Sequence, residues 1–280
     1  MSETITKDPV PTIIIEPPKR WVPVNWREIW EYRELLYFFV WRDLKVRYKQ
    51  TAIGVSWVVI KPFFSMVVFT LFFGNVLKVP SDGVPYALFS FAGILPWNLF
   101  ADGLGRSTGS MLENAGILTK VYIPRLILPI ASVISPVVDF FVALVIFILI
   151  MPLFHYVPTV NVVAVPLFIA FTVFTALSLG LWLASFAVKY RDIIHAVPFL
   201  IQIGFFVSPV IYPVTILPPS MKFLYSLNPM AGIIDGFRWA FLGTAAPGPS
   251  IFISLGVVIV MFISGLFFFR SVEQYFADIV

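Results

Sequence analysis

Two carboxylates, Asp102 and Asp139, lie in or beside the long apolar stretches of this sequence, where an acid is costly and usually functional. Such an acid can relay protons, or it can pair with a neighbour in the interior of a helix bundle. Proton- or sodium-driven carriers usually hold a set of acids with partners, and these stretches contain no cluster of carboxylates. We therefore favour an interior or paired position for Asp139 and keep a proton relay as the alternative.

Other chemistries have little support in the sequence. The chain of 280 residues has no cysteine, which excludes disulfides, thiolate metal sites and a cysteine nucleophile. Its two histidines, His155 and His195, lie forty residues apart and are more typical of interfacial polar residues than of a metal site. No Gly-Lys dipeptide occurs, so a Walker phosphate-binding loop is absent, as are the GxSxG and HExxH motifs. We expect no catalytic residue, no metal and no cofactor in this chain.

The elements that carry the two acids are apolar segments of membrane-crossing length. Hydrophobic residues make up 59% of the chain and charged residues 12%, whereas soluble domains carry ~25% charged residues. A membrane-crossing helix needs ~20 apolar residues. The sequence therefore predicts an all-α membrane protein with six transmembrane helices, which excludes a soluble enzyme. The predicted spans cover approximately residues 52–77, 86–104, 126–154, 162–188, 193–211 and 251–269.

The basic residues indicate the orientation of these spans. Ten of the nineteen Lys and Arg residues precede Pro62. If the amino terminus is cytoplasmic, sixteen fall on the inner side and three, Lys78, Lys222 and Arg238, on the outer side. Cytoplasmic flanks of spans carry such an excess, so we expect both termini to be cytoplasmic. The same distribution explains the net charge of +4 by contact with membrane lipids, without a nucleic-acid partner.

Three further segments accompany the spans. Residues 1–24 lack a continuous apolar core and are expected to form a flexible cytoplasmic tail. Residues 26–50 place Trp and Tyr opposite charged residues at helical spacing, which favours an amphipathic interfacial helix; a soluble helix packed on a partner is the alternative. Residues 212–249 hold six prolines between apolar runs too short to span. We expect a re-entrant helical hairpin there, between helices five and six, with an ordinary extracellular loop as the alternative.

Six short motifs follow one another along this predicted topology. They are residues 41–51 (WRDLKVRYKQT) with Ile53, Gly54, Trp57 and Pro62 after them, 91–100 (FAGILPWNLF), 114–125 (NAGILTKVYIPR), 190–192 (YRD), 208–213 (SPVIYP) and 228–229 (NP). From residue 26 to the carboxyl end, the chain resembles the permeases of type-2 ABC exporters. It most resembles their polysaccharide-exporting branch, the exporters of O-antigen, capsule and teichoic acid. Each motif is weak alone, and six in register are specific. Ile53 departs from the pattern, in which leucine is common.

The resemblance implies a transmembrane domain at residues 25–280 that works as a homodimer with two separate ABC ATPase subunits. ATP and magnesium would be bound by those subunits, in agreement with the missing Walker loop. The substrate would be a lipid-linked polysaccharide, and the location the cytoplasmic (inner) membrane of a bacterium. A drug or lipid exporter of the same fold is one alternative. An ATP-independent carrier or membrane enzyme is another.

The resemblance also implies residue roles. The ATPases would grip the interfacial helix and the inner segment 113–125, for which the charged candidates are Arg42, Asp43, Arg47, Glu113, Lys120 and Arg125. The alternative role of these residues is contact with lipid headgroups. A pathway between two protomers would be lined partly by aromatic residues, here Trp97, Phe100 and Tyr212. The outer hairpin would act as a gate, and Asp235 and Arg238 are expected to pair across it.

Overall fold

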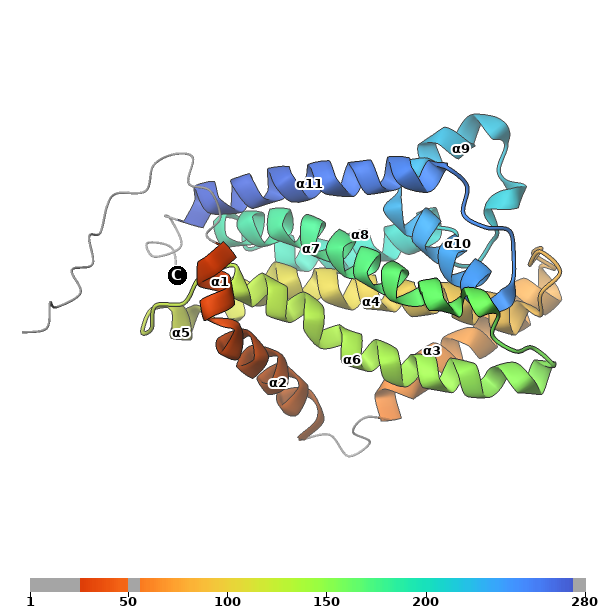
Figure 1. Cartoon of the computed structure of the whole chain (residues 1–280), viewed down its shortest axis with the longest axis horizontal. Helices are drawn as coiled ribbons and strands as arrows, with labels where there is room; N and C mark the ends of the chain where they lie inside the picture. Colours follow the sequence, from red (N-terminus) through yellow and green to blue (C-terminus); the bar gives the residue numbers. More distant parts are fainter. Residues whose placement is uncertain (1–25, 50–55, 274–280) are drawn as a thin grey trace, which may run out of the picture.

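The computed structural model describes residues 26–49 and 56–273, and every regular element in these two ranges is a helix. The expected tail at 1–24 and the first residues of the first expected span lie outside the described residues. The long helices run roughly side by side, as Figure 1 shows. The short helices α1 (Trp26–Glu31) and α5 (Ala115–Leu118) lie at one end of the molecule, here called the α5 end, and α9 (Pro219–Ser226) lies at the other, the α9 end (Figure 1).

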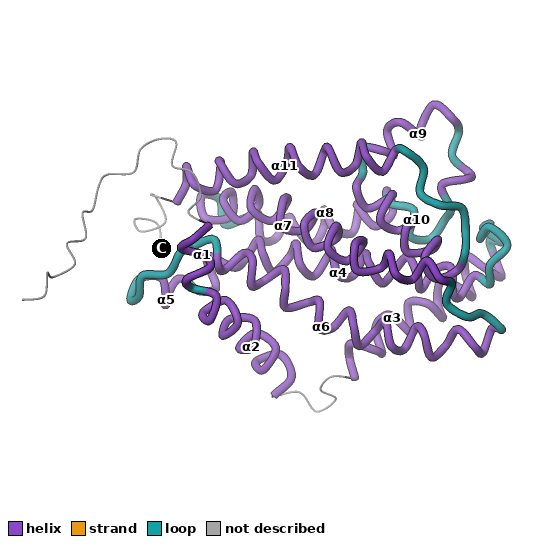
Figure 2. Tube along the Cα trace, in the orientation of Figure 1, coloured by secondary structure: helices purple, strands orange, loops and turns teal. Residues whose placement is uncertain are grey.

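Within residues 26–49 and 56–273, five helical segments are long and apolar enough to cross a membrane. They confirm that five of the six expected spans are long apolar helices. Figure 2 shows that the loops joining these helices gather at the two ends of the bundle. The segments are α3 (Ser56–Phe69) with the π-helix η1 (Thr70–Val76), α4 (Tyr86–Glu113), α6 (Ile127–Ile150) with η2 (Met151–Phe154), η3 (Val160–Ala164) with α7 (Val165–Lys189), and α11 (Ser250–Glu273).

The expected span at 193–211 is shorter in the structure. Helix α8 (Ile193–Val207) has 15 residues and ends where Ser208 takes an extended backbone conformation. Ser208 precedes Pro209, and the proline ring disfavours helical geometry in the residue before it. Alone, 15 residues are too few to cross the hydrocarbon core, so the count of six spans stays a prediction.

Helix α4 is longer than the expected 86–104 and is the central helix of the bundle. In the most apolar 18-residue stretch of this helix, 83% of the residues are buried. The helix packs against α3, α6, α7, α8 and α10 (Pro229–Leu242). The polar residues after Leu104 continue the helix because most of them are buried among neighbouring helices instead of lying in an inner loop. At the crossing with α7, a Cβ on Gly180 would lie 2.4 Å from Ser107 Oγ, so the two backbones approach closely.

The expected single helix at 26–50 is divided at Tyr32 into α1 and α2 (Arg33–Lys49). Helix α2 packs on α6, with Phe39 as its buried side chain. Trp30 and Tyr37 are each 71% exposed, so these aromatic side chains lie away from the bundle. An interfacial position for this helix stays a prediction.

The segment expected to form a re-entrant hairpin contains two helices of different character. Helix α10 is largely buried and packs on α4, α7 and α11, whereas α9 exposes Phe223 and Leu224. Asn228 caps α10, because its side-chain oxygen accepts a hydrogen bond from the Met230 amide at 3.0 Å. Gly243 ends α10 with a φ of +69°, the left-handed conformation that favours glycine. Whether the pair enters the bilayer as a hairpin stays a prediction.

Candidate functional site

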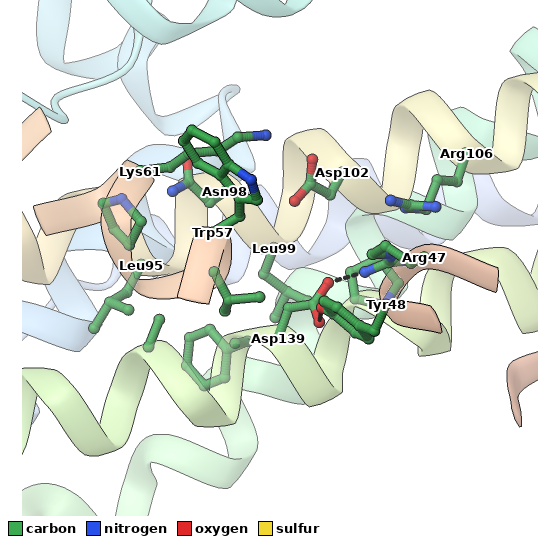
Figure 3. A pocket seen from close by; sticks show the side chains of 15 residues that line it. Arg47, Tyr48, Trp57, Lys61, Leu95, Asn98, Leu99, Asp102, Arg106 and Asp139 are labelled. Atoms are coloured by element: carbon green, nitrogen blue, oxygen red, sulfur yellow. Dashed lines mark hydrogen bonds and ion pairs between the residues drawn. The ribbon is translucent and has the colours of Figure 1, made fainter. Parts of the chain in front are cut away.

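A cavity of about 430 Å³ lies where α2, α3, α4 and α6 meet (Figure 3). Its apolar wall includes Leu95, Leu99 and Phe140. Five charged residues also line it: Arg47, Lys61, Asp102, Arg106 and Asp139. A charged cavity of this size inside a membrane bundle is a candidate binding site, since small-molecule pockets measure roughly 300–1,000 Å³.

Asp139 of α6 has partners from α2, as favoured from the sequence. Its carboxylate accepts hydrogen bonds from the Arg47 guanidinium and the Tyr48 hydroxyl (Figure 3). Arg47 also donates to Ser135 Oγ at 2.9 Å. The side chains of Arg47 and Asp139 are 18% and 15% exposed, so the pair is largely removed from water. Burial lowers the pKa of Arg47, and the nearby charge of Arg106 adds to this effect. The relay alternative stays untested.

Two other candidates for ATPase coupling, Arg42 and Asp43, connect α2 to the end of α4. Arg42 donates to Asn114 Oδ1 at 2.8 Å and to Asp43 Oδ1 at 2.8 Å, and its guanidinium lies 4.7 Å from the centre of the Phe39 ring. Asn114 directly follows α4 and also donates to the Ser110 carbonyl at 2.8 Å. These charged groups therefore face the bundle, and Arg42 joins α2 to the end of α4.

The remaining coupling candidates lie toward the α5 end of the bundle. Glu113 ends α4 and is exposed, Lys120 is exposed after α5, and Arg125 is half-buried before α6. In the same segment, the Tyr122 hydroxyl donates to Glu28 Oε1 of α1 at 2.8 Å, and this bond raises the pKa of Tyr122 to about 12. The structure thus places segment 113–125 against α1, apart from the cavity that holds Arg47. The coupling role of all six residues stays a prediction.

The expected pathway residues are not gathered on one open surface. Trp97 and Phe100 are 4% and 6% exposed, with ring centres 5.4 Å apart, and Trp97 packs edge-on against Phe205 of α8. Contact with a passing substrate would require α8 to move away from α4. Tyr212 follows α8, and its hydroxyl donates to the Phe206 carbonyl at 3.0 Å and shares a hydrogen bond with the Tyr225 hydroxyl.

The expected pair Asp235 and Arg238 is present, but within one helix and not across a gate. Its closest N–O distance is 3.7 Å, one turn apart on α10. Arg238 is 2% exposed, and its guanidinium lies 3.5 Å from the centre of the Phe89 ring of α4. It also donates to the Val210 carbonyl at 2.8 Å and lies 3.4 Å from the Tyr212 carbonyl. Arg238 therefore joins α10 to α4 and to the chain after α8.

Asn98 and Arg106 line the cavity and were missed from the sequence, whereas Asp102 was identified there as one of two acids in or beside the apolar stretches. Asn98, Asp102 and Arg106 recur at intervals of four, which places them on one face of α4, and this spacing was a usable signal. Lys61 lies on α3 and lines the same cavity. The partnership of Ser135 with Arg47 had no such signal, because it joins residues 88 positions apart.

These features define a multi-pass membrane protein that is helical throughout its described elements, with five candidate spans among the residues that the structure describes. Residues 34–242 match the family model described as ABC-2 type transporter, so the chain belongs to the ABC-2 type transporter family.

The chain is similar to curated members of that family. It is 29% identical to the O-antigen export system permease protein RfbA of Myxococcus xanthus over 255 residues, 90% of this chain and 97% of the relative. A Klebsiella pneumoniae protein of the same name is 25% identical, covering 88% of this chain and 95% of the relative. The polysialic acid transport protein KpsM of Escherichia coli is 20% identical, covering 83% and 91%.

Proposed function

We propose that this chain is the membrane subunit of an exporter that moves a lipid-linked, O-antigen-like polysaccharide across the cytoplasmic membrane of a bacterium. The observation that carries the proposal is the match to an O-antigen export permease over 97% of the relative's length at 29% identity. The resemblance of the six motifs to the same branch supports it.

The energy for export would come from another polypeptide. This chain has no Gly-Lys dipeptide and therefore no Walker loop, so two ABC ATPase subunits would bind the ATP and magnesium. A second copy of the chain would complete the pathway. In the most apolar 18-residue stretches of α3–η1 and α11, only 11% and 17% of the residues are buried. These helices therefore leave apolar surface free for contact with lipid and with a second copy.

In this proposal the α5 end of the bundle is cytoplasmic and the α9 end is external, following the excess of basic residues on the expected inner side. The chain would cross the membrane six times, with α8 and the segment after it completing one crossing. Both termini would then be cytoplasmic, and α9 and α10 would form the outer gate.

Depletion of the chain in cells that make the glycan tests this function. We expect lipid-linked glycan to accumulate inside, and a Walker-containing protein to co-purify with the chain in detergent. Unchanged surface glycan with drug hypersensitivity would indicate a drug or lipid exporter of the same fold. Full transport by the chain alone without ATP would contradict the proposal and indicate a carrier.

Docking of the ATPases at segment 113–125 gives a sharper test. Replacing Lys120 and Arg125 by alanine is expected to uncouple ATP hydrolysis from export, because both charges lie where the ATPase would press on α1, α4 and α6. The measurement is glycan export together with ATPase rate in proteoliposomes. Lys78→Ala, exposed just after η1 on the expected outer side and outside the proposed gate, is the matched control and should export normally. Normal export by the double variant would show that the docking assignment is wrong.

A further inference from the structure

The cavity between α2, α3, α4 and α6 contains charges that the bundle itself does not neutralise. Asp139 balances Arg47, but Lys61, Asp102 and Arg106 have no ion pair within residues 26–49 and 56–273. In the same part of the chain, Arg106 Nε is buried without a hydrogen-bond acceptor, as is Arg47 Nε. A buried cationic donor without an acceptor is costly, so a ligand that supplies oxygen atoms would be stabilised here.

The position of these groups favours a ligand with both negative charge and hydroxyl donors. Asn98, Asp102 and Arg106 lie on successive turns of α4, and Lys61 of α3 lines the same cavity (Figure 3). Two cations suit phosphate oxygens. The carboxylate between them opposes a bare anion but can accept hydrogen bonds from sugar hydroxyls, and the Asn98 amide can do the same or donate.

The surroundings of the cavity suit a molecule with a lipid tail. Leu95, Leu99 and Phe140 form an apolar wall beside the charges. Segment α3–η1, which closes one side, is poorly buried and exposes Phe63 and Phe64 outward. Arg106 lies seven residues before the end of α4, roughly 10 Å along the helix axis. A head group could therefore sit at the depth of an inner leaflet while its tail remains in the bilayer beside α3.

We propose that this cavity binds the phosphate-bearing head of the exported glycan's lipid carrier, with Lys61 and Arg106 on the phosphate oxygens and Asp102 and Asn98 on the first sugar. This inference rests on the proposed function, because the carrier head of a lipid-linked glycan carries phosphate and sugar together.

Binding of a carrier analogue to the full complex in phosphatidylcholine nanodiscs tests the inference. The probe is geranylgeranyl diphosphate, which has the charge and an isoprenoid tail but no sugar. We expect it to raise the melting temperature in a saturable way, since a ligand that binds the folded state stabilises it. Arg106→Gln and Lys61→Gln should each weaken the binding of the probe at least tenfold, whereas Lys222→Gln on exposed α9 should leave that binding unchanged. Equal binding in all three variants would overturn the inference.

Asp102→Asn provides a test that does not depend on loss of function. The Asp102 carboxylate repels a diphosphate that lacks the sugar. Its replacement by a neutral amide should therefore tighten the binding of geranylgeranyl diphosphate about threefold or more. The same change should weaken the binding of an analogue that carries a sugar on the diphosphate. Tighter binding of both probes, or of neither, would contradict the assignment of Asp102 to the sugar.

Two further probes separate the possible sources of phosphate. Inorganic pyrophosphate binding as tightly as the isoprenoid probe would show a soluble-anion site and overturn lateral lipid entry. Phosphatidylethanolamine or phosphatidylglycerol competing equally would show a general phospholipid site and overturn the carrier assignment.

If depletion stops glycan export but Arg106→Gln binds the probe normally, the inference fails while the proposed function stands. If depletion leaves glycan export intact, the proposed function fails whatever the probe does.

Discussion

At the scale of single residues, arginine side chains join the helices of this apolar bundle through an ion pair and hydrogen bonds. Arg47 and Asp139 lie 92 positions apart in the chain and join α2 to α6. Arg42 and Asn114 join α2 to the end of α4. Arg238 joins α10 to the carbonyl of Val210. Each contact fixes a segment that apolar packing alone would leave free to slide.

Removal of one partner from the Arg47–Asp139 pair is expected to destabilise the protein. Asp139→Ala leaves the largely buried guanidinium without its counterion, which should lower the free energy of unfolding by about 1–3 kcal/mol. The measurement is thermal unfolding in detergent. Arg47→Met combined with Asp139→Ala should recover part of the loss, because no charge then remains buried. Strictly additive losses would argue against the pair. Separately, normal export by Asp139→Asn would exclude the proton relay.

The Asp235 carboxyl predicts a pH dependence. Burial raises its pKa from 3.8 to about 6, against the opposing effect of Arg238 and with a smaller contribution from Asp82. Because the folded protein holds this proton more tightly than the unfolded chain, the group favours the folded state below pH 4, and this contribution is lost as the pH rises through 6. The melting temperature of Asp235→Asn relative to the original chain should therefore rise between pH 4 and pH 6.5. A constant difference across this range would contradict the raised pKa.

At the scale of elements, the crossing of α4 and α7 depends on small residues. Gly180→Ala would place a methyl group 2.4 Å from Ser107 Oγ, and overpacking of this kind costs about 1–3 kcal/mol. We expect a lower melting temperature for this variant. Gly256→Ala on α11 is the matched control, since an added Cβ there meets nothing within 4 Å and should be tolerated. Ser107→Gly should rescue Gly180→Ala. Equal effects of the two alanine variants would show that the crossing is not close-packed.

The sequence predicted the elements better than their ends and their partners. Apolar length located all five candidate spans, since hydropathy alone sets that requirement. It placed the end of α4 too early, because Ser107 and Ser110 read as a polar loop, whereas both are buried within the helix. It placed the end of α8 too late, because the effect of Pro209 on Ser208 was not weighed.

Pairing between elements was less predictable than the elements themselves. Asp235 and Arg238 were expected to interact, and a spacing of three on one helix is sufficient reason for that. Arg42 pairs with the adjacent Asp43, but its other partner, Asn114, and the partners of Arg47 lie 72 or more positions away, where helix periodicity carries no information. The cavity required knowledge of how α2, α3, α4 and α6 pack, although the spacing of Asn98, Asp102 and Arg106 indicated its polar face.

At the scale of the whole molecule, the two ends of the bundle differ in what they hold. The α5 end carries the short helices α1 and α5, and the α9 end carries α9 and α10 (Figure 1). The proposed function assigns these ends to opposite sides of the membrane, and the assignment can be measured because the chain has no cysteine of its own.

Introduced cysteines should therefore report the orientation directly. Val157→Cys, in the exposed loop between α6 and α7, is expected to react with a membrane-impermeant maleimide in intact cells with a permeabilised outer membrane. Thr119→Cys, exposed after α5, should react only after the inner membrane is opened. The cysteine-free chain is the control. The reverse labelling pattern would contradict the cytoplasmic placement of α5 and of both termini.

The π-helical turn at Thr70–Val76 affects which side chains of the α3–η1 segment face neighbouring helices. A π-helix fits one more residue into each hydrogen-bonded turn than an α-helix does, so the stretch contains a residue in excess of the regular repeat. If this excess passed out of the helix, the residues on one side of the turn would rotate by about 100° relative to the other. The same apolar segment would then take a second register, in which side chains that now face outward would face a neighbouring helix.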